Sequence, residues 1–126
     1  MNGESIRVNP VTTLEEASFL HAGTGRFQET GMDGFLDAMS ARVWRDRGVG
    51  DFWGHMLVAR GAAQVMAEPE LSMWDVAALE PIVTEAGGRL TYLNGDAWTG
   101  EGSALTTCGG GIHDEVVGLA TQLGIA

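Results

Sequence analysis

Short apolar runs alternate along the chain with longer stretches in which apolar residues recur every three or four positions. Alternating polar and apolar residues at positions 5–9 predict a strand that Pro10 ends. Three more short runs have the length and composition of strands: residues 64–67, 90–92 and 104–107. Because strands alternate with helix-like stretches, the pattern predicts a layered α/β domain with a mixed sheet and flanking helices.

Five stretches carry the capping residues and apolar spacing of helices: residues 12–20, 34–44, 52–60, 76–86 and 113–123. Thr12 or Thr13 can cap the first helix, and Asp51 can cap the third. We expect Gly87 to end the fourth helix in a left-handed conformation and Pro81 to bend it. Turns or loops are predicted at residues 47–50, 68–70 and 94–95.

Composition narrows the functional class. The chain has 126 residues and a formal net charge of -10, with only seven Lys and Arg residues. This balance argues against nucleic acid as a partner, because phosphate backbones require basic side chains. A single cysteine, Cys108, excludes an intrachain disulfide framework and a cysteine-based zinc cluster. No apolar run approaches the roughly 20 residues of a membrane span. No signal peptide is visible, so we expect no membrane association and a cytoplasmic location by default.

The most specific pattern opens with Trp74-Asp75 and closes with Glu85-Ala86-Gly87-Gly88. It places Asp75 at the start of a helix whose other residues are nearly all apolar or small. The partial positive charge and free N–H groups at that helix end help to organise anionic ligands. An isolated aspartate at this position is usually a helix cap. The combined pattern favours a carboxylate that binds a metal ion instead.

These residues resemble the second signature of the inositol-monophosphatase-like family of magnesium-dependent phosphatases. Residues 47–61 resemble its histidinol-phosphatase branch, through Arg-x-x-Gly-Asp followed by Val-Ala-x-Gly. The likeness covers nearly the whole chain. It implies the carboxy-terminal half of the inositol-monophosphatase/fructose-bisphosphatase-like fold, with Asp75 as a Mg²⁺ ligand and a metal-activated water attacking a phosphate monoester.

The resemblance also implies three residues near the substrate: Arg47, Asp51 and Glu68. Asp51 is expected to meet a cationic amine or imidazole, and Glu68 is expected to contact the non-phosphate end of the substrate. Structural alternatives stay open for each of them. They are a solvated surface charge for Arg47, a helix cap for Asp51 and a solvated loop residue for Glu68. Glu70 has no counterpart in the resemblance and is expected at the surface.

Other candidate residues are interpreted as structural. His113 is expected to be a capping or buried structural histidine, and Cys108 a buried apolar residue. Trp44 and Trp53 are expected in the core. The sequence contains no Gly-x-Ser-x-Gly elbow, P-loop, His-Glu-x-x-His motif or dinucleotide-binding fingerprint.

The family's other half contributes a Glu-Glu pair and an Asp-Pro-x-Asp-Gly-Thr segment, and no Asp-Pro-x-Asp-Gly-Thr segment occurs here. We therefore expect residues 1–126 to form a single domain of a truncated phosphatase that alone binds magnesium weakly and has no useful activity. The leading hypothesis is the substrate-side half of a phosphomonoesterase that acts on histidinol phosphate in histidine biosynthesis. Inositol phosphate, a sugar bisphosphate or a phosphorylated adenylate are alternative substrates. The other alternative is a non-catalytic module that forms a homodimer or pairs with the missing amino-terminal half through an uncovered apolar face.

Overall fold

A mixed sheet of five strands organises the chain in this computed structural model, which describes residues 5–49, 52–71 and 73–125. Its strands lie in the order β2-β1-β3-β5-β4 and are β1 (Ser18–His21), β2 (Arg45–Gly48), β3 (Val65–Leu71), β4 (Arg89–Thr91) and β5 (Gly102–Thr107). β1 runs parallel to β2 and β3, whereas β5 runs antiparallel to β3 and β4. The predicted α/β fold with a mixed sheet and flanking helices is confirmed.

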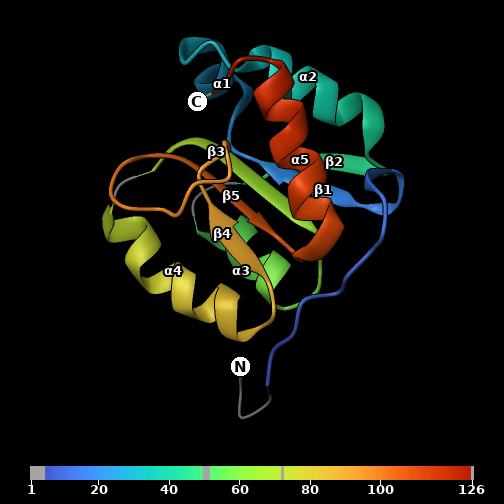
Figure 1. The fold of residues 1–126 in the computed structure, drawn as a ribbon, viewed down its shortest axis with the longest axis vertical. Coiled ribbons are helices and arrows are strands. Elements are labelled where there is room, and N and C mark those ends of the chain that lie inside the picture. The colour runs from blue at the N-terminus through green and yellow to red at the C-terminus, as the bar shows by residue number, and fades with distance from the viewer. Residues whose placement is uncertain (1–4, 50–51, 72, 126) are drawn as a thin grey trace.

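Helices cover both faces of this sheet, as Figure 1 shows. One face carries α1 (Thr24–Glu29), α2 (Asp33–Arg42) and α5 (Gly110–Gln122), and the other carries α3 (Trp53–Ala59) and α4 (Met73–Glu85). Gly87 follows α4 with a φ of 94°, which confirms the predicted left-handed stop. Within the described ranges, no helix combines the length and the apolar character that crossing a bilayer requires.

Successive strand residues point into two different apolar layers. Phe19, Val65 and Leu105 pack against α1, α2 and α5 in one cluster. Leu20 and Met66, their neighbours in the chain, pack on the opposite face near α3. Because β1 and the first part of β3 are covered on both faces, their residues are buried consecutively.

The helix expected over residues 12–20 is wrong. Only Leu14–Glu16 form a helical turn, and Ser18–His21 form β1. All four β1 residues are buried, because β1 has a paired strand on each side and helices on each face. A short apolar run of this kind is compatible with either a buried helix or a buried strand. Pairing with two neighbouring strands determined its secondary structure.

Two further local predictions also fail. Residues 5–9 form no strand, and instead the Val8 N–H donates to the Ala86 carbonyl at 3.0 Å, which attaches this segment to the end of α4. Arg47 and Gly48 lie in β2 rather than in a turn, because their backbones pair in parallel with β1.

The tryptophans expected in the core lie at the surface. Trp44 is 64% exposed and Trp53 is 46% exposed. The Arg45 guanidinium stacks on the Trp44 ring at 4.6 Å. On the outer side of α3 and α4, Phe52 and Trp74 are also exposed, at 58% and 90%. These two helices therefore present an aromatic surface to solvent.

Candidate functional site

The carboxyl ends of β1, β2 and β3 lie at one edge of the sheet because the three strands are parallel. From β1 the chain passes through α1 and α2 to β2, which is at one edge of the sheet. From β3 it passes through α4 to β4, which is at the opposite edge. The chain therefore changes direction between the carboxyl ends of β1 and β3, where open α/β sheets bind their ligands. We take this edge as the candidate site.

β3 extends past this edge and carries Glu68 with it. Its pairing with β1 stops at Ala67, so the backbone beyond that residue has a partner strand on one side alone. Pro69, which lacks an N–H donor, is accommodated there. The register with β5 shifts between Glu68 and Leu71 but the pairing continues. The predicted loop at this position is therefore wrong, because antiparallel pairing with β5 keeps the segment extended.

The Glu68 side chain is buried, with only 4% of the residue exposed. Its Oε1 lies 3.3 Å from Nε2 of His55, which is fully buried on α3. These two atoms are close enough for a hydrogen bond but not aligned for one, and neither has another partner in the described part of the chain. The other ring nitrogen of His55, Nδ1, lies 2.8 Å from Oγ1 of Thr106 on β5. A buried imidazole therefore connects β5 to the carboxylate at the candidate edge.

Gly54 allows α3 to approach the sheet closely. A Cβ atom at this position would lie 2.7 Å from Cε of Met66 on β3, a distance that real Cβ atoms do not tolerate. His55 is adjacent to this contact and reaches both β3 and β5. The sequence analysis missed His55. Two features of the sequence could have indicated it. His55 is an ionisable residue within a short apolar helix, and Glu68 is an ionisable residue that directly follows three apolar strand residues.

The two predicted aspartates are placed only through the elements around them. Asp51 lies outside the described residues, between the end of β2 at Gly48 and the start of α3 at Trp53. Asp75 lies near the beginning of α4, and its side chain is outside the described part of the structure. α3 and α4 follow β2 and β3 directly in the chain. The roles predicted for both aspartates stay predictions.

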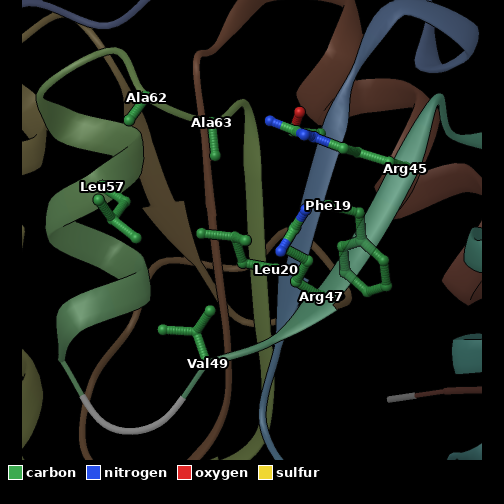
Figure 2. Close-up of a pocket in the computed structure, with 9 residues that line it drawn as sticks. Phe19, Leu20, Arg45, Arg47, Val49, Leu57, Ala62 and Ala63 are labelled. Atoms are coloured by element: carbon green, nitrogen blue, oxygen red, sulfur yellow. The ribbon is translucent and has the colours of Figure 1, made fainter.

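Arg47 is exposed on β2, at the edge of the sheet. Figure 2 shows Arg45 and Arg47 beside a hollow of about 180 Å³, with Leu57 of α3 on its opposite side. β1 separates β2 from β3, and no ion pair joins Arg47 to Glu68 among the residues that the structure describes. The structure therefore does not bring these two predicted substrate contacts together.

His113 is a structural residue, as the sequence analysis predicted. It is 1% exposed, and its Nε2 and Nδ1 atoms each lie 2.9 Å from a threonine hydroxyl, Thr91 Oγ1 and Thr107 Oγ1. Burial, with a smaller effect from the nearby positive charge of Arg89, lowers the pKa of His113 to about 4. The side chain is therefore neutral at pH 7, and both of its ring nitrogens have hydroxyl partners. Cys108 is buried, also as predicted.

The side chains that the structure describes do not form a metal site by themselves. Among these described side chains, no three of His, Cys, Asp or Glu converge on one point. Mg²⁺ requires near-octahedral oxygen coordination, which one carboxylate cannot supply. The described donor set therefore does not fit a complete magnesium centre.

Comparisons with known proteins agree with this architecture. Residues 1–122 match the inositol monophosphatase family. A histidinol-phosphatase of Streptomyces coelicolor is 46% identical over 118 residues, which are 93% of this chain and 44% of that protein. A histidinol-phosphatase of Mycobacterium tuberculosis is 42% identical over 112 residues, which are 89% of this chain and 43% of that protein. The chain thus spans less than half the length of these curated relatives.

The solved structure of an IMPase from Thermotoga maritima has a TM-score of 0.83 and 30% sequence identity with this chain. The superposition covers 97% of this chain and again about half, 47%, of the other. The predicted resemblance to the family and to histidinol-phosphatases is therefore confirmed. Since the family match spans residues 1–122 and the fold agrees with it, this chain belongs to the inositol monophosphatase family.

Proposed function

We propose that the longer protein carrying this chain hydrolyses a phosphate monoester, histidinol phosphate, and that this chain recognises the non-phosphate end of the substrate. The observation that carries the proposal is the buried Glu68 carboxylate at the carboxyl edge of the parallel strands. The identity with two histidinol-phosphatases over about nine tenths of the chain supports the choice of substrate.

Glu68 has the chemistry that a cationic substrate requires. Histidinol phosphate carries an ammonium group and an imidazole, and both are donors for a carboxylate. A buried carboxylate attracts such a group strongly, because little water screens the interaction. We assign the same kind of contact to Asp51, which precedes α3 in the chain. Arg47 is proposed as a further substrate contact, although it lies on the outer strand β2.

Magnesium is part of this proposal through Asp75. When bound, Mg²⁺ would activate a water molecule and neutralise charge on the phosphoryl group. Asp75, near the amino end of α4, would supply one oxygen ligand where the helix dipole also favours anions. The remaining ligands would come from residues outside the described part of this chain.

The test is to compare two substitutions in the longer protein, Glu68→Gln and Glu70→Gln. Both remove one carboxylate from the end of β3, but Glu70 is at the surface and pairs with Arg26 at 3.0 Å. We expect Glu68→Gln to lower kcat/KM for histidinol phosphate by about tenfold to a hundredfold, the cost of losing a hydrogen bond to a charged group. Glu70→Gln should leave kcat/KM unchanged. Equal values for the two variants would contradict the proposal.

Inositol phosphate is the second candidate substrate, favoured by the 30% identity to the Thermotoga IMPase. Its hydroxyl groups are neutral, so replacing glutamate with glutamine costs them less binding energy than it costs an ammonium group. If inositol 1-phosphate is the better substrate of the wild-type protein, and Glu68→Gln reduces its turnover only slightly, this second function replaces the first.

A further inference from the structure

The contact between His55 and Glu68 is unusual because both partners are buried. His55 is fully buried and the Glu68 side chain is 6% exposed, yet Nε2 and Oε1 face each other at 3.3 Å without a completed hydrogen bond. A buried carboxylate oxygen that lacks a donor among the described residues is costly, so the arrangement requires an explanation. At 3.3 Å the two atoms are within the donor–acceptor distance of a hydrogen bond, and only the alignment is lacking.

The Thr106 hydroxyl can stabilise the tautomer of His55 that carries its proton on Nε2. This hydroxyl lies 2.8 Å from Nδ1 and can donate to it. When Nδ1 acts as the acceptor, Nε2 carries a proton. Nε2 is then a donor atom 3.3 Å from Oε1 of Glu68. The opposite tautomer would place a nitrogen lone pair against a carboxylate oxygen, which is repulsive.

We propose that His55 is a positioning residue for Glu68: held by Thr106, it donates from Nε2 to Oε1 and orients the carboxylate for the substrate. The inference rests on the proposed function only for the identity of the substrate contact. The buried contacts among Thr106, His55 and Glu68 exist independently of it.

The first experiment measures this arrangement in the 126-residue chain itself. Nitrogen-15 NMR of the imidazoles, assigned with His55→Asn, reports which nitrogen of His55 is protonated. We expect a protonated Nε2 whose resonance shifts in Glu68→Gln, and a loss of the single tautomer in Thr106→Val. A proton on Nδ1 alone, or a spectrum of His55 unaffected by Glu68→Gln, would overturn the proposal.

The second experiment separates positioning from a general effect on stability. In glutamine the amide nitrogen sits roughly where Nε2 of histidine lies, whereas in asparagine it corresponds to Nδ1. His55→Gln therefore keeps a donor near Glu68, and His55→Asn loses it. In the longer protein we expect His55→Asn to raise KM for histidinol phosphate by about tenfold or more with kcat little changed, and His55→Gln to restore most of the loss.

Equal KM values for the two variants, or a fall in kcat alone, would show that His55 is only structural. Failure of the proposed function is recognised separately. It would appear as absent turnover of histidinol phosphate by the wild-type protein, or as an unchanged KM in Glu68→Gln, without any reference to the His55 variants. The NMR result in the 126-residue chain does not depend on either outcome.

Discussion

Two consecutive threonines of β5 each hold a buried histidine, one on each face of the sheet. Thr106 contacts His55 on the α3 side, and Thr107 contacts His113 on the α5 side. Each of these hydroxyl groups lies within hydrogen-bonding distance of a ring nitrogen, which reduces the cost of burying the imidazoles. His113 has both ring nitrogens occupied, whereas His55 retains Nε2 for Glu68. Identical side chains therefore have different roles because of their neighbours.

His113 predicts how stability depends on pH. In the folded chain its pKa is lowered, chiefly by burial, from 6.5 to about 4. Between these values the unfolded chain binds more protons, so the free energy of unfolding should decrease as pH falls from about 6.5 to about 4. Urea unfolding of the wild type and His113→Gln across this range measures the effect. The carboxylates titrate in both proteins, so a slope with pH that is the same in both would contradict the prediction.

At the scale of elements, the connection from α4 to β4 is the most constrained turn. Gly87 has a φ of 94°, which favours glycine, and Gly88 packs against β5. A Cβ atom at Gly88 would lie 2.6 Å from the Thr107 carbonyl oxygen and 3.1 Å from Val83 Cγ1. The Glu-Ala-Gly-Gly pattern is thus explained by packing among α4, β4 and β5. The predicted left-handed conformation of Gly87 is part of this turn.

We expect Gly88→Ala to lower the free energy of unfolding by about 1–3 kcal/mol, because the methyl group would meet the backbone of β5. The matched control is Gly118→Ala in the interior of α5, where a Cβ would meet no atom within 4 Å. That change should raise stability by about 0.5–1 kcal/mol through helix propensity. Chemical denaturation measures both, and destabilisation of equal size in the two variants would refute the packing argument.

For the molecule as a whole, the exposed surface of α3 and α4 is the most prominent feature. A hollow of about 410 Å³ lies between these helices. It is lined by Phe52, Met56, Trp74, Ala78, Leu79 and Ile82. Apolar patches of this kind on soluble proteins mark association surfaces. The non-catalytic alternative, a chain that pairs with itself or with another chain, depends on this surface.

We expect the isolated chain to self-associate through this face, because burying Trp74 removes a large aromatic surface from water. Trp74→Glu should shift the chain towards monomer in size-exclusion chromatography with light scattering. Trp44→Glu is the control, since Trp44 is also exposed but lies beside β2. A wild-type chain that is monomeric at all concentrations would exclude this expectation.

Sequence patterns predicted the longer elements well. The second, fourth and fifth predicted helices correspond to α2, α4 and α5, and the glycine stop after α4 has the expected backbone conformation. The secondary-structure predictions that failed concern short segments: residues 5–9, β1, β2 and the end of β3. The three strand segments gain their form from a neighbouring strand distant in the chain, and local periodicity carries no information about that neighbour.

The candidate site, like the fold, was predicted from the sequence only in part. The sequence by itself selected Glu68 and Asp75 as candidates, because their motif spacing is a property of the chain alone, and their roles stay predictions. It also determined the family, since the motifs can be recognised in the sequence without the structure. Only the tertiary structure decided that Glu68 is buried, that His55 is its neighbour and that Trp53 is exposed. The physical reason is that burial and pairing depend on which elements lie side by side, and residues 55, 68 and 106 meet only when α3, β3 and β5 pack together.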